Sequence, residues 1–182
     1  MIKVYITDLA AYNKGFLIGE WISLPLDQND LKAAIKKTLR GGEAICAIEY
    51  GYEPHEEWFI SDYEWEDVDL FTIDEYEDIY ALNEKLTILE VLNIDHLKGI
   101  RFLLDERLAN SFDDAISKLE DVIIYNNTNL KDYAYELMEE LYDLNKLPSL
   151  ITSNIDYEGI AKDLSFEGRY YEVDGDLYEY IN

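Results

Sequence analysis

The chain has 182 residues, enough for one or two ordinary domains or three very small ones. Its 48% of hydrophobic residues excludes a disordered acidic tail, while its single cysteine, Cys46, excludes an internal disulfide. Forty Asp and Glu residues against 15 Lys and Arg residues give a formal net charge of −25. Solubility alone needs a net charge of only about 2–8 in magnitude. Abundant large apolar residues oppose halophilic adaptation, so the charge favours a protein that binds a cationic partner.

The first 61 residues predict a mixed α/β module. Asn29 or Asp30 is expected to cap a short helix that Gly41-Gly42 ends. Cys46 lies in an apolar run typical of a buried strand, which indicates a small core residue and not a nucleophile. The strands expected in this module cover residues 3–7, 15–24, 44–48 and 57–61.

Residues 62–103 predict a small, mainly helical module. Asp74 with Glu77 has the spacing of a capping box ahead of one short helix. Thr87 with Glu90 repeats that spacing ahead of a second helix, and Gly99 offers a stop.

Residues 104–182 predict a second mixed module. Ser111 is expected to cap a helix, residues 122–125 form a short strand, and Asn129 caps the clearest helix of the chain. The apolar residues of that helix follow helical spacing at Leu130, Ala134, Leu137, Met138, Leu141 and Leu144. A short helix over 157–164 and a closing hairpin over 169–180, with its turn at Asp174-Gly175, complete the chain. The fold class expected is therefore α+β, an elongated chain of three small modules (mixed α/β, helical, mixed α/β).

The acidic residues gather in two segments. No Lys or Arg occurs between Arg40 and Lys85, and that interval contains the whole of the first set. The first candidate set is Glu53, Glu56, Glu57, Asp62, Glu64, Glu66, Asp67, Asp69, Asp74, Glu75, Glu77 and Asp78. The second, on the helix that follows Asn129, is Asp132, Glu136, Glu139, Glu140 and Asp143.

The spacing of these carboxylates resembles that of phosphates in DNA. Helix residues three or four apart have Cβ atoms about 5–6 Å apart. Alternate strand residues lie about 6.6 Å apart, at a rise of about 3.3 Å per residue. Duplex DNA carries one charge for about every 1.7 Å of its axis, or about every 3.4 Å along one strand. Rows of carboxylates can thus meet the Lys and Arg side chains that otherwise bind DNA, although any single row is more typical of an ordinary solvated helix face.

Other chemistry finds little support in the residues. His55, expected in an exposed loop, and His96 belong to no metal-binding pattern, and Asp174-Gly175-Asp176 lacks the further ligands of a calcium loop. We therefore expect no metal and no cofactor. The sign of the charge opposes direct nucleic-acid binding, which the small basic face over 32–40 cannot overcome. Neither a signal peptide nor a membrane-spanning segment is indicated, so a cytosolic protein is expected.

Several stretches resemble the ArdA antirestriction proteins of conjugative plasmids and transposons. Val4-Tyr5-Ile6-Thr7-Asp8-Leu9, Tyr12-Asn13-Lys14-Gly15 and Gly19-Glu20-Trp21-Ile22 are similar to the N-terminus of that family. Glu139-Glu140-Leu141-Tyr142, running into Leu147-Pro148, resembles its antirestriction motif region. Ile155-Asp156-Tyr157-Glu158 and the segment from Arg169-Tyr170 to Leu177-Tyr178 resemble the C-terminal part. The likeness runs along nearly the whole chain.

The resemblance implies a bacterial, cytoplasmic inhibitor without chemistry of its own. It implies an elongated homodimer that mimics bent B-form DNA and occupies the DNA-binding groove of a type I restriction–modification enzyme, at its methyltransferase core. The dimer contact is expected in the last module, with Phe112, Ile123 and Tyr125 as candidates.

Two alternatives stay open. The chain could be an acidic adaptor or chaperone for a basic DNA-binding protein, which would tolerate rearranged carboxylates better than a mimic. It could also be a hydrolase using two carboxylates, although with 40 acidic residues such pairs arise by chance.

Overall fold

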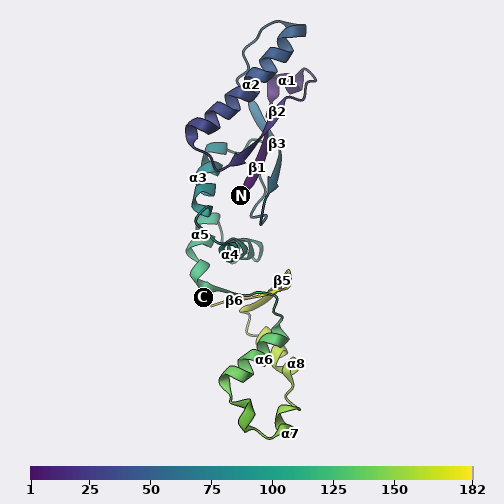
Figure 1. The fold of residues 1–182 in the computed structure, drawn as a ribbon, viewed down its shortest axis with the longest axis vertical. Helices are drawn as coiled ribbons and strands as arrows, with labels where there is room; N and C mark the ends of the chain where they lie inside the picture. Colours follow the sequence, from purple (N-terminus) through teal and green to yellow (C-terminus); the bar gives the residue numbers. More distant parts are fainter. Residues whose placement is uncertain (182) are drawn as a thin grey trace. The chain divides into compact units, whose positions relative to one another are not determined.

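The computed structural model describes residues 1–181 and divides into two compact units, Met1–Leu97 (unit 1) and Lys98–Asn182 (unit 2). Both contain helices and antiparallel strands, which confirms the α+β class (Figure 1). The three-module division at residues 61 and 103 and the elongated shape stay predictions. Within the described residues, none of the helices is long and apolar enough to cross a membrane.

Unit 1 is built on a three-stranded antiparallel sheet in the order β2-β1-β3. Its strands are β1 (Ile2–Asp8), β2 (Gly19–Leu24) and β3 (Trp58–Trp65). Alternation along β1 is strict at its start, because Ile2, Val4 and Ile6 are fully buried while Lys3 and Tyr5 are partly exposed. The sheet therefore has a core face and an opposite face, which we call the outer face.

The core face of this sheet packs against α2 (Gln28–Tyr50). Asp27 caps this helix, and the side chains of Leu31, Ile35 and Leu39 face the core as expected. The helix does not stop at Gly41-Gly42, so the strand predicted over 44–48 is wrong. Cys46 is nevertheless buried, as predicted, on the helix instead of a strand.

Close packing explains why Gly42 lies inside a helix. A Cβ atom at residue 42 would lie 2.0 Å from Oδ2 of Asp8, whereas one at residue 41 would meet only Ile18 Cγ2, at an ordinary 3.7 Å. Glycine at 42 therefore lets α2 approach the end of β1, and its cost in helix propensity is offset by a long buried helix face.

Unit 1 also contains α1 (Leu9–Asn13), α3 (Ile79–Leu89) and the start of α4 (Ile94–Asp105). The capping boxes predicted at Asp74 and Thr87 are wrong: Asp78 caps α3, and Thr87 lies within it, donating a hydrogen bond to the carbonyl of Asn83. Gly99 does not stop a helix either, since it lies inside α4, where a Cβ would come within 3.0 Å of Leu119.

Unit 2 contains a second antiparallel sheet in the order β4-β6-β5. Its elements follow the predictions closely, including the hairpin, whose turn has positive φ at both Asp174 and Gly175. The elements are α5 (Phe112–Ser117), a 3₁₀ turn (Leu119–Asp121), β4 (Val122–Tyr125), α6 (Leu130–Leu141), a 3₁₀ turn (Leu144–Lys146), α7 (Ser149–Thr152), α8 (Tyr157–Ser165), β5 (Tyr170–Val173) and β6 (Asp176–Tyr180).

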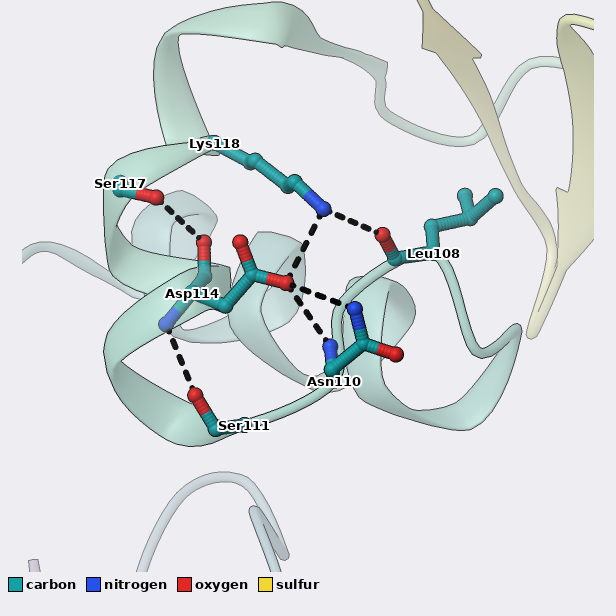
Figure 2. Close-up of polar contacts among 6 residues, drawn as sticks. All are labelled: Leu108, Asn110, Ser111, Asp114, Ser117 and Lys118. Carbon is teal, nitrogen blue, oxygen red and sulfur yellow. Dashed lines mark hydrogen bonds and ion pairs between the residues drawn. The ribbon is translucent and has the colours of Figure 1, made fainter.

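The start of α5 is held by a polar network (Figure 2). Ser111 caps the helix by accepting a hydrogen bond from the backbone N–H of Asp114, as predicted. The Asp114 carboxylate accepts from the N–H of Asn110 at 2.9 Å and from Lys118 at 3.0 Å, and Lys118 also donates to the carbonyl of Leu108. The backbone bond from Asn110 and the Lys118 ammonium lower the pKa of Asp114 below its ordinary value.

One hydrophobic cluster of unit 2 lies between α6, α8 and the sheet. Leu130 and Ala134 of α6 pack with Leu164 of α8 and with Leu177 of β6. The helix predicted to run to Leu144 ends at Leu141, because the backbone is extended at Tyr142. Leu141 is 62% exposed. Asn129 caps α6 by accepting from the N–H of Asp132, as predicted.

Candidate functional site: an exposed carboxylate surface

The first acidic set lies on three consecutive parts of unit 1. Glu53, Glu56 and Glu57 belong to the segment before β3. Asp62 and Glu64 lie within β3, and the next three acids follow its end. The last group, from Asp74 to Asp78, precedes α3. Every member of the set is exposed except Glu77, which is half-buried. Asp74 to Asp78 line an open hollow of the surface.

A β-bulge decides which face of the sheet carries the acids of β3. Tyr5 pairs with Asp62, but the next residue, Ile6, pairs with Ile60, so Ser61 is an extra residue. Directly paired residues share a face. Without the bulge, Asp62 and Glu64 would follow Ile60 onto the core face; with it, they lie on the outer face beside Tyr5 and Lys3.

The segment before β3 is fixed by a buried polar pair. His55 was predicted to be an exposed loop residue, and this is wrong: its side chain is fully buried, with Nδ1 2.6 Å from Oδ2 of Asp8. The Glu43 carboxylate accepts from the backbone N–H of His55 at 3.0 Å, and Asp8 also caps α1 by accepting from Ala11. The ring nitrogen Nε2 has no partner among the described residues. This anchor fixes the backbone that carries Glu53, Glu56 and Glu57.

Some carboxylates of the first set are paired with cations. Lys14 donates to Glu53 at 2.8 Å, and this hydrogen bond lowers the pKa of Glu53 and raises that of Lys14. Lys3 lies 3.5 Å from Glu66, and the amino group of Met1 lies 3.4 Å from Asp67. Within the described part of the chain, the remaining members form no ion pair, so most of this charge is left uncompensated.

The second acidic set lies on the solvent side of α6. Asp132, Glu136, Glu139 and Glu140 are exposed on the helix, opposite the buried Leu130 and Ala134. Asp143 follows the end of α6 and pairs with Lys146 at 2.8 Å, and Glu139 accepts a hydrogen bond from Tyr135 at 2.8 Å. Glu139, Glu140 and Asp143 also line an open hollow.

The predicted dimer residues have different surroundings. Ile123 is 40% exposed on β4, an edge strand of its sheet. Tyr125 is half-buried, with its ring 4.7 Å from that of Tyr133 and its hydroxyl donating to Glu179 at 3.0 Å. Burial and these two neighbours raise the pKa of Tyr125. Phe112 is half-buried at the start of α5.

Two residues that sequence reasoning missed are Tyr5 and Trp21. They lie on adjacent strands, their ring centroids are 5.3 Å apart, and Trp21 is 45% exposed on the face that also carries Asp62, with Tyr5 between the two. The alternation of Trp21 with the buried Ile22 could have indicated an exposed aromatic side chain. No group of three or more His, Cys, Asp or Glu side chains suited to a metal ion is found within residues 1–181.

The fold and this surface define an acidic α+β protein with ordered, exposed carboxylates on both of its units. Its family is established by a family model, described as antirestriction protein (ArdA), that matches residues 4–179. The chain belongs to the ArdA family of antirestriction proteins, as the resemblance predicted. No curated protein matches the chain.

Proposed function

We propose that this chain inhibits type I restriction–modification enzymes by occupying the DNA-binding groove of their methyltransferase core. It acts as a mimic of B-form DNA, with carboxylates in place of phosphates, and performs no reaction. The proposal places it in the bacterial cytoplasm, where such enzymes act. Membership of an antirestriction family makes restriction enzymes the targets.

The observation that carries the proposal is the order of the exposed acids. Asp62 and Glu64 are held on one face of a sheet, and Glu136 and Glu140 on one side of a helix. Rigid carboxylates can meet several cationic side chains of a groove at once without losing conformational freedom on binding. A flexible polyanion would lose that freedom.

Displacement of DNA tests the proposal. The purified protein is titrated into a type I methyltransferase bound to a labelled duplex containing its target, at two salt concentrations. Release of the duplex near stoichiometric protein, weaker at the higher salt concentration, is expected because the contacts are charged. An unrelated DNA-binding protein is the control: equal release from it, or none from the methyltransferase, would reduce the chain to a general polyanion or to an adaptor for another basic protein.

Graded loss separates a mimic from an enzyme. Single Asp-to-Asn or Glu-to-Gln changes across both sets are each expected to weaken inhibition only severalfold, because binding is spread over many pairs. Removing one catalytic carboxylate would instead abolish activity. A complete loss at one or two positions, with the fold intact, would favour the hydrolase alternative.

We also propose that the protein is a homodimer joined through unit 2, with Phe112, Ile123 and Tyr125 at or near the contact. Ile123→Asp is the cleaner test, because Tyr125 is packed on Tyr133 within its own unit. Dissociation of the variant in sedimentation equilibrium is expected, and an intact dimer would remove Ile123 from the contact.

A further inference from the structure

The outer face of the sheet in unit 1 carries aromatic side chains as well as carboxylates. Three strands contribute to it, and paired residues form two short rows across them, Trp21–Tyr5–Asp62 and Ser23–Lys3–Glu64. Trp21, Ser23, Asp62 and Glu64 are exposed. An aromatic surface therefore adjoins two carboxylates on a face that the core helix α2 does not cover.

The aromatic pair is held in place by the strands beneath it. A Cβ atom on Gly19 would lie 2.4 Å from Cε1 of Tyr5, so the Tyr5 ring lies against the backbone of β2 and needs glycine there. Trp21 meets this ring edge-on, with an angle of 64° between the ring planes. Two side chains that support each other in this way form a rigid platform.

The opposite side of unit 1 carries exposed basic residues. Along α2, Lys32, Lys36 and Arg40 are exposed and follow one another at intervals of four residues, so they share one side of the helix. Lys36 and Arg40 have no ion-pair partner among the described residues, while Lys37 pairs with Glu20 of β2. On the outer face, by contrast, Lys3 is paired with Glu66.

These observations show that the unpaired cations of α2 and the acids Asp62 and Glu64 lie on opposite sides of the sheet in unit 1. A cationic groove attracts the face with Asp62 and Glu64 and repels the side with Lys36 and Arg40, which orients the unit during approach. On the platform, an arginine fits best: its guanidinium plane can stack on Trp21 or Tyr5 while its N–H groups donate to Asp62. Such a contact combines stacking with charge, as a base and its phosphate do.

We propose that the outer face, with Trp21, Tyr5, Asp62 and Glu64, is the docking surface of unit 1 for an arginine-bearing basic surface of its partner, and that α2 faces away. This inference rests on the proposed function, because the partner used to test it is the restriction enzyme's methyltransferase core.

Matched variants test the surface. Asp62→Asn with Glu64→Gln is expected to weaken binding to the methyltransferase at least about tenfold. Asp30→Asn with Glu49→Gln makes the same change of charge at exposed positions of α2 and is expected to leave binding within about twofold, since small surface effects are typical away from a contact. Equal losses in the two double variants would overturn the proposal.

Trp21→Ala tests the stacking. It is expected to weaken binding about 3- to 30-fold, the range of a cation–π contact, with its salt dependence unchanged. Retained affinity would overturn the role of the platform, and the circular dichroism melting curve of each variant checks its fold.

Chemical acetylation of lysines in the complex tests the orientation of unit 1 without any amino-acid substitution. In the complex, Lys3 on the outer face is expected to be protected, while Lys36 on α2 stays reactive. Protection of Lys36 alone would show the reverse orientation and overturn the inference while leaving the proposed function standing. Failure of the unmodified protein to bind the methyltransferase at all would instead overturn the proposed function.

Discussion

Some carboxylates of this highly acidic chain serve the fold and not the surface charge, and Asp8 and Asp114 are two of them. Asp8 is completely buried, where its oxygens meet His55 and the backbone N–H of Ala11 in α1. Asp114 holds the start of α5 through Asn110 and Lys118 (Figure 2). Each of the two carboxylates accepts at least two hydrogen bonds from groups of its own unit.

Removing His55 is predicted to destabilise unit 1. In His55→Ala, the buried Asp8 carboxylate loses a partner and a cavity is left, so we expect a loss of about 3 kcal/mol in the free energy of unfolding. Urea denaturation measures it. The matched control is His96→Ala at the other, exposed histidine, expected within about 0.5 kcal/mol of the parent protein. Similar stabilities of the two variants would contradict the role given to the buried pair.

Asp114 is predicted to make a pH-dependent contribution. Because its folded-state pKa is lower than its ordinary value, its contribution is fully present above the unfolded-state pKa and is lost as pH falls through the folded-state pKa. Asp114→Asn should therefore be less stable than the parent at pH 7, and the difference should shrink below pH of about 4. Urea midpoints of both proteins at several pH values measure this, and a constant difference would exclude it.

At the scale of elements, α2 shows why two adjacent glycines differ. Gly41-Gly42 has the pattern of a helix stop, but neither glycine has positive φ and the helix continues to Tyr50. The contact of Gly42 with Asp8 and the burial of Cys46 beyond it stabilise the continued helix. Local helix-breaking propensity is here outweighed by packing.

The two glycines are predicted to respond oppositely to alanine. Gly41→Ala fits without a clash and should stabilise the protein by about 0.5–1 kcal/mol, the difference in helix propensity. Gly42→Ala should destabilise it by more than about 1 kcal/mol, because the new methyl group would displace Asp8 from His55. Thermal unfolding of both variants decides, and equal shifts of Tm would mean that the close approach at Gly42 does not matter.

On the scale of the whole molecule, the net charge of −25 has opposite consequences for folding and for binding. Like charges on each unit repel one another in the folded state, and salt screens this repulsion. Salt equally screens the attraction between the carboxylate surface and a cationic groove. The salt concentration thus separates the effect of the charge on folding from its effect on binding.

Stability and inhibition are therefore predicted to change in opposite directions with salt. Between about 0.02 and 0.5 M NaCl, where the screening length falls to a few ångströms, Tm should rise and the affinity for the methyltransferase should fall. Differential scanning calorimetry and the DNA-displacement titration measure the two. An affinity independent of salt would contradict a charge-based mimic, since apolar contacts would then dominate.

The sequence alone determined those features that depend on neighbouring residues. The caps Ser111 and Asn129 start helices because each side chain accepts from a backbone N–H three residues on, and Asp174-Gly175 forms the hairpin turn because both residues adopt positive φ. The total charge, its two segments and the exposure of nearly all their members also follow from composition and order. The likeness to the ArdA family was also recognised from short stretches of neighbouring residues.

Only the tertiary structure decided which way the acids face and what holds them. The bulge at Ser61 moves Asp62 and Glu64 to the outer face, although plain alternation places them beside the buried Ile60. The buried ring of His55 forms a hydrogen bond with Asp8, which lies 47 positions earlier in the chain. The same carboxylate lies close to Gly42, where the missing side chain lets α2 continue against the end of β1. Each of these outcomes depends on contacts between distant residues, whose energies exceed the local preferences that a sequence pattern expresses.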